Sequence, residues 1–371
     1  MASKIQVEET LRTVMDDKGK ILPGAQYPDL NEAKLTKLYD TMTMVRVVDD
    51  RMMRLQRQGR LGFYMKALGE EATHMAVAAL EDSDWVYPSY REQGAWFWRG
   101  YGIENFINQL FGNVNDPVKG RQMPVHHSAD WLNIVSISSP VGTQIPQAVG
   151  TAMAQKIAGT KECTISYFGE GTSSMGDFHV ALNFAGVAKA PCIFVCRNNG
   201  YAISVPLEKQ TAAKSFAIRA LGYGIHGVRV DGNDVLAVLQ VTHEAAERAR
   251  NGEGPTLIEA VTYRREGHSS SDDPSVYRDA KEPEEWAKKD PLVRFRGFLK
   301  DKGIWTQKLE DDTVEKHNQA ITDALEAAST MDAPAIGTLF NEVFESKPWH
   351  LEEQEEWLMS QERTKNPHVH G

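Results

Sequence analysis

The stretch CTISYFGEGTSSMGDFHVALNFAGVAKAPCIFVCRNNGYAIS, residues 163–204, decides the fold. It contains two short apolar runs, 163–168 and 192–197, whose β-branched and aromatic residues are typical of buried strands. Residues 177–190, between these runs, have the composition of a helix. A strand, a helix and a second strand in this order predict a βαβ unit, in which the two strands are parallel.

The alternation of strands and helices continues on both sides of this unit. The further predicted elements are strands at 84–90, 226–230 and 255–264 and helices at 31–58 and 69–81. Asn233 could cap the helix that follows the strand at 226–230. Residues 1–30 are predicted to be a loosely structured arm, and the chain becomes helical and polar beyond Pro291. The pattern predicts an α/β fold with a mostly parallel sheet and helices on both faces.

The composition excludes some classes of partner. The 371 residues are 41% hydrophobic and 25% charged, and the formal net charge is −10, so nucleic acid is not an expected partner. No apolar run approaches the roughly 20 residues of a membrane helix. Three cysteines, Cys163, Cys192 and Cys196, are expected to be buried thiols. The acidic N-terminus MASKIQVEETLRTVMDD fits neither a transit peptide nor a signal peptide, so we expect a cytoplasmic, bacterial protein.

Polar clusters follow the two strands of the central unit. Gly169, Glu170 and Gly171 follow the first strand, and Arg197 and Asn199 follow the second. Both clusters are expected at the carboxyl edge of the sheet, where ligands bind. Carboxylate and amide oxygens suit Mg²⁺, the glycines let the backbone approach an anion, and the arginine can form two hydrogen bonds with a phosphate. The crossover helix, expected to begin just after the first cluster, would direct its N-terminus at that anion. Each cluster alone would indicate a turn, whereas the two together predict a metal–diphosphate site.

Two further clusters are expected at the same edge. Tyr90 and Arg91 follow a predicted strand, and Arg91 could hold the diphosphate, although an isolated arginine there would be an ordinary surface residue. His268 lies in the polar loop GHSSSDD, after a strand that ends in Arg264. A solitary histidine is usually a surface residue, but a loop at this edge favours catalysis.

Several segments together match one enzyme family. They are GFYM, GEEATH, YREQG, GRQMPVHH, ISSPVGTQIPQAVG, YFGEGTSSMGDFH, CRNNGYAIS, VRVDGNDV and TYRREGHSSSDD, and they span roughly residues 30–300. The chain resembles the alpha subunit of the decarboxylating component of 2-oxo acid dehydrogenase complexes, most closely the branched-chain type, 3-methyl-2-oxobutanoate dehydrogenase. The resemblance implies the thiamine-diphosphate-binding fold. It also implies thiamine-diphosphate-dependent oxidative decarboxylation of branched-chain 2-oxo acids, with reductive acylation of the lipoyl group of a partner acyltransferase.

The resemblance also implies roles for individual residues. The Mg²⁺ ligands would be Glu170, Asn199 and the carbonyl of Tyr201. The catalytic residues would be His268, Tyr90 and Arg264, and the substrate pocket would be lined by Phe63, Tyr90 and Val141. The cofactor-binding residues would be Tyr90, Arg91, Ser139, Val141, Gly169, Glu170, Gly171, Thr172, Arg197, Asn199, Tyr201 and His268. In some relatives K⁺ binds a turn that maps to Ser138, Pro140, Thr143 and Gln144.

The implied partners are a beta subunit, in a tetramer of two alpha and two beta chains, and the lipoyl domain of the dihydrolipoyl acyltransferase. In the family a glutamate of the beta subunit activates the cofactor, so this chain is expected to be inactive alone. The expected organisation is an N-terminal arm and helix start over 1–45, a diphosphate-binding α/β domain over 46–300 and a helical C-terminal segment over 301–371 that contacts a partner subunit.

Alternative functions remain open on the sequence alone. Val141 replaces a bulkier residue common in the branched-chain type, and RREGH differs from the usual RIGHH, so a pyruvate or acetoin dehydrogenase alpha subunit is the nearest alternative. A non-catalytic scaffold subunit and a Mg²⁺-dependent phosphate-ester hydrolase are alternatives from other classes. The retention of Glu170, Asn199 and Arg197 argues against a scaffold, and no convincing nucleophile or water-positioning base supports a hydrolase.

Overall fold

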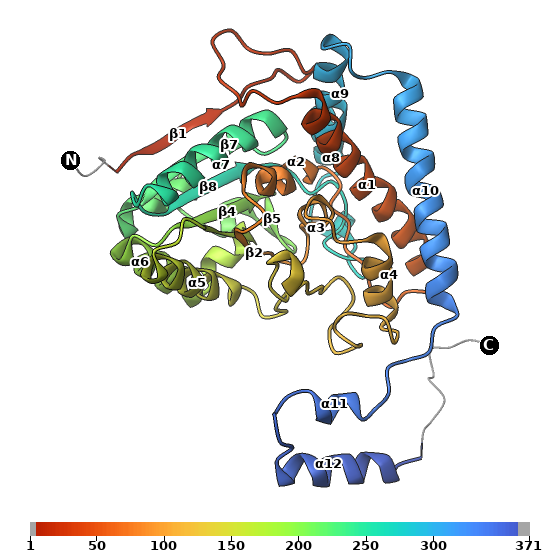
Figure 1. The fold of residues 1–371 in the computed structure, drawn as a ribbon. Helices are drawn as coiled ribbons and strands as arrows, with labels where there is room; N and C mark the ends of the chain where they lie inside the picture. Colours follow the sequence, from red (N-terminus) through yellow and green to blue (C-terminus); the bar gives the residue numbers. More distant parts are fainter. Residues whose placement is uncertain (1–4, 363–371) are drawn as a thin grey trace.

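A parallel β-sheet forms the centre of the computed structural model, which describes residues 5–362 (Figure 1). The six strands lie in the order β1-β7-β8-β4-β3-β2, and every neighbouring pair is parallel. Their bounds are β1 Val7–Arg12, β2 Trp85–Tyr87, β3 Thr164–Gly169, β4 Cys192–Asn198, β7 His226–Asp231 and β8 Thr256–Val261. A short antiparallel pair, β5 (Tyr201–Ala202) and β6 (Val205–Pro206), follows β4. The predicted α/β fold is confirmed.

Helices cover both faces of the sheet, which explains why the central strand β4 begins with the continuous apolar run CIFVC. On one face, α5 (Gln144–Ala158) and α6 (Gly176–Ala188) share a core with Phe194 of β4. On the other face, α7 (Val235–Arg250) shares a core with the adjacent residue Val195. Successive side chains of β4 thus enter two different cores, as the period of a strand requires.

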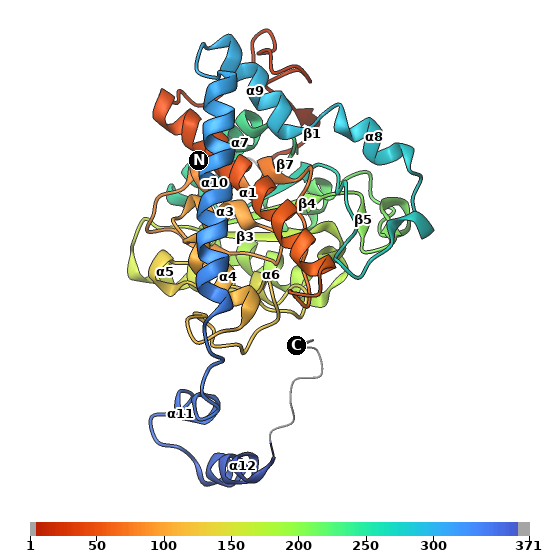
Figure 2. The same ribbon diagram turned by 90° about the vertical axis from the view of Figure 1, so that its right-hand side faces the viewer.

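Most of the remaining helices extend the α7 side of the molecule. Their bounds are α1 Glu32–Arg57, α2 Glu71–His74, α3 Gln93–Trp98, α4 Ile103–Phe111, α8 Lys281–Ala287, α9 Pro291–Asp301 and α10 Gln307–Ser329. Helices α1 and α10 pack together, and α10 also contacts α4 (Figure 2). The last two helices, α11 (Thr338–Asn341) and α12 (Trp349–Ser360), project from this body (Figures 1 and 2). Arg121 joins α11 to the body, because it donates to the Thr338 carbonyl and pairs with Glu342.

The N-terminal segment differs from the sequence expectation, because Val7–Arg12 form strand β1 rather than a loose arm. The strand lies at the edge of the sheet, with Val7 opposite Gly227 of β7. Its sequence, VEETLR, lacks an apolar run because four of its six residues are exposed. Backbone hydrogen bonds to β7 stabilise this strand, and hydrophobic periodicity does not reveal an edge of this kind.

Two helices also begin differently from the prediction. Asp234, rather than Asn233, caps α7, and its carboxylate accepts hydrogen bonds from the N–H groups of Leu236 and Ala237 at 3.1 Å. Asn233 instead donates to the carbonyl oxygen of Lys289 at 2.8 Å. The helix predicted over 69–81 is the short α2 followed by a 3₁₀ helix.

The predicted domain boundaries stay predictions, although α1 continues without a break across residue 45. The predicted buried thiols are confirmed, since Cys163, Cys192 and Cys196 are all free and buried. Among the helices of residues 5–362, none is both long and apolar enough to cross a bilayer.

Candidate active site

A cavity of about 410 Å³ opens at the carboxyl edge of the sheet. Loops that follow β2, β3, β4 and β8 meet there, and these four strands are adjacent. The strand order reverses between β4 and β8, and such a switch point is where open α/β sheets bind ligands. Every residue predicted for thiamine diphosphate, the substrate, Mg²⁺ or catalysis lines this cavity: Phe63, Tyr90, Arg91, Ser139, Val141, Gly169, Glu170, Gly171, Thr172, Arg197, Asn199, Tyr201, Arg264 and His268. Their individual roles stay predictions.

Glu170 and Asn199 lie on neighbouring loops, since Gly169 of β3 is paired with Arg197 of β4. Glu170 is 1% exposed, and its carboxylate accepts hydrogen bonds from the Asn199 N–H and from Gln210 Nε2, each at 3.3 Å. No Lys or Arg of the described chain forms an ion pair with it, and burial raises its pKa. A buried carboxylate that lacks a cationic partner, beside an amide side chain, fits a divalent cation.

Next to Glu170 and Asn199 lies a buried cluster of charged residues, made of two arginines and two glutamates. Glu70 lies 2.6 Å from Arg197 Nε and 3.7 Å from Arg91 Nε, and Glu92 pairs with Arg197 Nη1. Burial alone would lower the pKa of Arg197, but Glu92 and Glu70 raise it above its ordinary value. Within residues 5–362, Arg197 Nη2 has no hydrogen-bond acceptor, so a charged donor remains for an anion such as a diphosphate.

Glu70 and Glu92 are absent from the predicted set, although they lie in the quoted segments GEEATH and YREQG. Glu70 accepts a hydrogen bond from Asn199 Nδ2 at 2.9 Å, which fixes the side of the amide that carries the oxygen. The only sequence signal for Glu70 and Glu92 is that each is an acidic residue inside a segment that matches the enzyme family. Its partner, Asn199, follows 129 residues later, so the pairing requires the folded structure.

Gly171 brings the loop after β3 against the loop after β4. A Cβ at this position would lie 2.6 Å from the Cβ of Ala202. The crossover helix predicted over 177–190 is confirmed as α6, Gly176–Ala188, although a 3₁₀ helix over Glu170–Ser174 delays its start after Gly171. The Gly-Thr-Ser-Ser segment has low helix propensity, which explains the delay.

His268 lies beside these arginines in the loop after β8. Burial, followed by the charges of Arg91 and Arg264, lowers the pKa of His268 to about 3, so its ring is neutral at physiological pH. Arg91 Nη2 lies 3.4 Å from His268 Nδ1 and can only donate, so the neutral ring carries its proton on Nε2. The Tyr90 ring packs edge-on against the imidazole, with centroids 5.8 Å apart.

Arg264 holds the loop that follows β4. Its Nη1 donates to the Tyr201 carbonyl at 3.3 Å, and its Nη2 donates to the Ile203 carbonyl at 2.6 Å. These bonds favour a positioning role for Arg264, and its catalytic role stays a prediction. Ile203 has a φ of +56°, a conformation that costs a β-branched residue roughly 1–3 kcal/mol. Burial, and then Glu282, raise the pKa of Tyr201 to about 12, so its hydroxyl remains a donor.

Apolar side chains form another wall of the cavity. Phe63 and Val141 were predicted there, and three methionines that were not predicted join them: Met65, Met123 and Met175. His126 is a further unpredicted residue of this wall, and it lies in the quoted segment GRQMPVHH. Its Nε2 lies 2.9 Å from Ser139 Oγ and its Nδ1 lies 3.0 Å from the Pro124 carbonyl oxygen.

The turn predicted for K⁺ lies just outside the cavity lining. Gln144 Nε2 donates to the Tyr167 carbonyl at 2.9 Å, and Thr143 Oγ1 donates to the Pro140 carbonyl at 3.2 Å. Ser138 completes the predicted set. Potassium binding stays a prediction.

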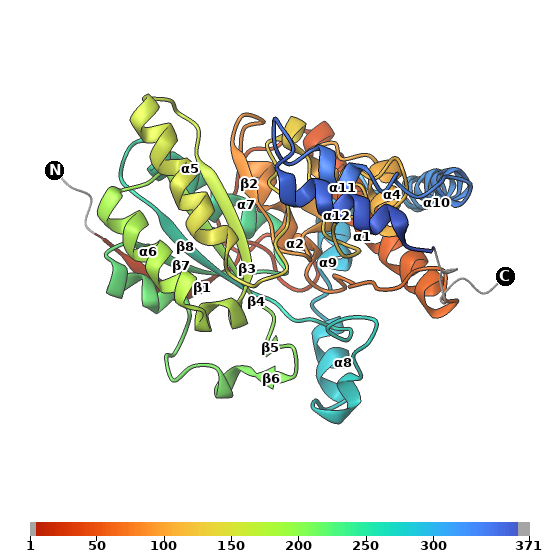
Figure 3. The same ribbon diagram turned by 90° about the horizontal axis from the view of Figure 1, so that it is seen from below.

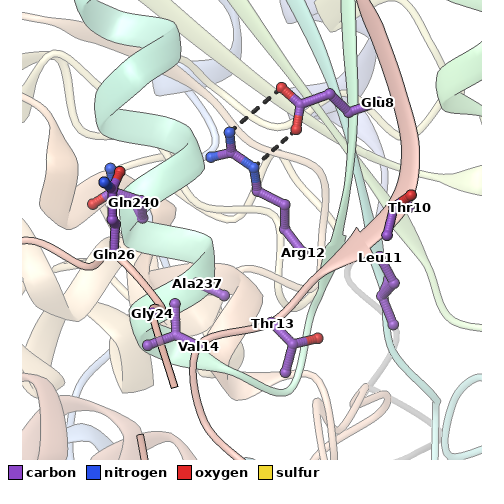
Figure 4. Close-up of a pocket in the computed structure, with 10 residues that line it drawn as sticks. All are labelled: Glu8, Thr10, Leu11, Arg12, Thr13, Val14, Gly24, Gln26, Ala237 and Gln240. Carbon is purple, nitrogen blue, oxygen red and sulfur yellow. Dashed lines mark hydrogen bonds and ion pairs between the residues drawn. The ribbon is translucent and has the colours of Figure 1, made fainter. Parts of the chain in front are cut away.

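A second cavity, of about 420 Å³, lies between β1, the loop that follows it and α7 (Figure 4). Arg12 is the only cationic residue of its lining. Its guanidinium is paired with Glu8 at 2.9 Å and with Glu244 at 2.8 Å. The positive charge is therefore already balanced, and this cavity does not resemble a diphosphate site.

Comparisons with known proteins point to one enzyme family. The family described as the dehydrogenase E1 component matches residues 39–336. The chain is 44% identical over 357 residues to the 2-oxoisovalerate dehydrogenase subunit alpha, mitochondrial, of Homo sapiens, covering 96% of this chain and 80% of that protein. It is 42% identical over 344 residues to the 2-oxoisovalerate dehydrogenase subunit alpha 2, mitochondrial, of Arabidopsis thaliana, covering 92% of this chain and 73% of that protein.

These relatives correct one expectation. They are named mitochondrial and come from eukaryotes, so the prediction of a cytoplasmic, bacterial protein is wrong. That prediction depended on the acidic character of residues 1–17, and local charge is weak evidence for the compartment of a protein.

Proposed function

The chain belongs to the dehydrogenase E1 component family, and from this premise we propose that it is the alpha subunit of a branched-chain 2-oxo acid dehydrogenase. The reaction is the thiamine-diphosphate-dependent oxidative decarboxylation of a 2-oxo acid such as 3-methyl-2-oxobutanoate, with transfer of the acyl group to a lipoyl group. The observation that carries the proposal is the cavity between the loops after β3 and β4. Among residues 5–362, it combines a buried carboxylate that has no cationic partner, an adjacent amide and an arginine donor that has no acceptor.

The cavity residues fit thiamine diphosphate together with Mg²⁺. The Glu170 carboxylate, the Asn199 amide oxygen and the Tyr201 carbonyl would bind the ion, and Arg91 and Arg197 would donate to the diphosphate. The bound cofactor supplies the carbon nucleophile and the electron sink that decarboxylation requires. A potassium ion on the turn of Ser138, Pro140, Thr143 and Gln144 would fix the neighbouring cofactor-lining residues.

His268 is the candidate catalytic residue. Since its ring is neutral with the proton on Nε2, it would donate that hydrogen bond to the substrate oxygen on which negative charge develops. Arg91 holds the backbone of His268 through a 2.7 Å hydrogen bond to its carbonyl, and Tyr90 supports the ring. This arrangement would orient the imidazole before the substrate enters.

The apolar wall supports a branched aliphatic substrate. Phe63 and Val141 would contact the side chain of the 2-oxo acid, and the neighbouring methionines can adapt to its shape. One methylene in an apolar pocket changes binding by only about 1–3 kcal/mol. Pyruvate or acetoin dehydrogenase activity is therefore the nearest alternative.

A beta subunit would complete the site in a tetramer of two alpha and two beta chains. Three residues of the cavity rim, Val141, Met175 and Ile203, are between 41% and 56% exposed, and a second chain could cover them. That chain would supply the acid that activates the cofactor. The segment 301–371 would contact a partner subunit, and the lipoyl domain of an acyltransferase would receive the acyl group.

Reconstitution with a beta subunit tests this proposal. Steady-state rates should be measured with 3-methyl-2-oxobutanoate, pyruvate and acetoin, alongside titration of thiamine diphosphate with and without Mg²⁺. We expect turnover only when both subunits, the cofactor and Mg²⁺ are present, with the highest kcat/KM for the branched acid. Cofactor binding without turnover of any of these substrates would favour a scaffold, and release of phosphate from esters would favour a hydrolase.

A further inference from the structure

Helix α8 presents one carboxylate to two loops that border the cavity. Glu282 accepts hydrogen bonds from the Tyr201 hydroxyl at 3.1 and 3.0 Å, one to each oxygen, and from the Tyr263 hydroxyl at 2.9 Å. Tyr201 begins β5 in the segment that follows β4, and Tyr263 lies in the loop after β8. Figure 3 shows α8 on the same side of the molecule as β5. Glu282 therefore joins these two loops from outside the cavity.

Ring contacts extend this connection toward the candidate metal ligands. Trp286 of α8 stacks on Tyr263, with centroids 5.4 Å apart and an interplanar angle of 9°. The Tyr263 ring also contacts Gly200: a Cβ added to this glycine would lie 3.6 Å from the ring. Gly200 has a φ of +89° and stands between Asn199 and Tyr201. Thus α8 supports the tight turn that separates two of the proposed ligands.

The loop after β4 needs such support, because its backbone is not in a relaxed conformation. Ile203 is β-branched, and its backbone has the left-handed conformation, which is unfavourable for such a residue. The loop is therefore expected to change shape if the contacts that hold it are removed. Arg264 restrains the loop through the Tyr201 carbonyl, and Glu282 restrains it through the hydroxyl of the same tyrosine. Tyr201 is thus held at both its backbone and its side chain.

We propose that Glu282 is a positioning residue for the divalent cation: by fixing Tyr201 and Tyr263, it keeps the Tyr201 carbonyl directed at the ion without touching it. The inference rests on the proposed function, in which Glu170, Asn199 and the Tyr201 carbonyl bind Mg²⁺. Residues that orient metal ligands in this way commonly change metal affinity when they are replaced.

The test measures metal affinity rather than turnover. The full chain, assembled with its beta subunit and saturated with thiamine diphosphate, is titrated with Mn²⁺, and free Mn²⁺ is followed by electron paramagnetic resonance. Glu282→Gln is expected to raise the dissociation constant about 10-fold. Tyr201→Phe should have a similar effect, and the double variant should be no weaker than the weaker single variant, because both changes act on the same contact between Glu282 and Tyr201. Glu284→Gln, an exposed acid on the same helix, is the matched control and should stay within about 2-fold of the unchanged protein.

The outcomes separate this inference from the proposed function. Wild-type affinity in both Glu282→Gln and Tyr201→Phe would overturn the positioning role and leave the metal site intact. Failure of the unchanged protein to bind Mn²⁺ with the cofactor would overturn the proposed metal site and the inference together. If Glu282→Gln does not assemble, Tyr201→Phe decides, because it removes only one hydroxyl group.

Discussion

Glu170 is buried and has no cationic partner among the described side chains, so the ligand-free and ligand-bound forms should respond to its replacement in opposite ways. Glu170→Gln removes a buried carboxylate, and the melting temperature of the ligand-free protein should stay unchanged or rise. The additional stabilisation by Mg²⁺ with thiamine diphosphate should be lost. Thermal unfolding with and without these ligands measures both effects. Glu208→Gln, an exposed acid nearby, should keep the ligand-induced shift, and retention of that shift in Glu170→Gln would contradict the metal role.

His268 should affect turnover far more than cofactor binding. His268→Ala is expected to lower kcat by about 10²–10⁴-fold, because a positioned hydrogen-bond donor is lost. The thiamine diphosphate dissociation constant, measured by fluorescence quenching in the assembled enzyme, should change by less than about 5-fold, because the arginine donors remain. His243→Ala, an exposed histidine of α7, provides the control. Unchanged turnover in His268→Ala would exclude the role proposed for it.

The contact between the loops after β3 and β4 depends on the absence of a side chain at Gly171. Gly171→Ala would place a methyl group against the Ala202 side chain and should lower the free energy of unfolding by about 1–3 kcal/mol. It should also weaken metal-dependent cofactor binding, since Glu170 precedes this glycine. The double variant Gly171→Ala/Ala202→Gly restores the space and should recover much of both losses. Urea denaturation and cofactor titration report on the two effects, and a lack of recovery would show that the contact is not the cause.

Helix α1 holds the segment that carries Phe63 and Met65 into the cavity wall, and this contact should depend on pH. Asp49 accepts hydrogen bonds from the Tyr64 hydroxyl at 2.8 Å and from the Ala67 N–H at 2.6 Å. Burial raises the pKa of Asp49 to about 7, which these hydrogen bonds only partly oppose. The folded protein therefore binds more protons than the unfolded chain between about pH 4 and pH 7.

Stability should consequently fall as pH rises through this window, and the effect of Asp49 should level off above its folded pKa. The loss is at most about 4 kcal/mol, from 1.36 kcal/mol per pKa unit. Urea denaturation between pH 5 and pH 8 measures this slope. Asp49→Asn should reduce the slope, although it also shifts the curve at every pH by the change in hydrogen bonding. An equal slope in both proteins would show that Asp49 is ionised when buried.

The elements that could be predicted from the sequence are those that a pattern of neighbouring residues reveals. Strands β3 and β4 are rich in apolar residues and buried on both faces, and their carboxyl ends and the segments after them carry the Gly-Glu-Gly and Arg-Asn-Asn-Gly clusters, so both the strands and the site edge could be predicted. Strand β1 could not, because an exposed edge strand is stabilised by its neighbour's backbone rather than by its own side chains. Glu70 and Glu282 act through partners 129 and 81 residues away, a relation that no local pattern contains.

At the scale of the whole molecule, α6 presents an apolar surface that the other residues of the 5–362 range do not cover. Val180, Phe184 and Val187 are each more than half exposed there. If a beta subunit covers this surface, Phe184→Asp should prevent assembly while circular dichroism of the chain stays unchanged. Val293→Asp, at an exposed position of α9, should assemble normally. Analytical ultracentrifugation distinguishes these cases, and normal assembly of Phe184→Asp would place the interface elsewhere.

The unmodified chain without a beta subunit should bind thiamine diphosphate with Mg²⁺ but release no carbon dioxide from 2-oxo acids. In the proposed function the cavity residues of this chain would face the diphosphate, and the rim residues Val141, Met175 and Ile203 are exposed. Addition of the beta subunit should restore turnover in the same sample. Carbon dioxide release by the isolated chain would contradict the shared site.

Strand β1 also bears on how the protein behaves when its first residues are removed. It occupies the outer side of β7, so a shortened protein beginning at α1 would leave the amide and carbonyl groups of His226–Asp231 without their neighbour. An uncovered strand of this kind recruits strands from other molecules. Trimming the polar segment before α1, which looks dispensable by composition, should therefore produce insoluble or self-associating material rather than a smaller active enzyme.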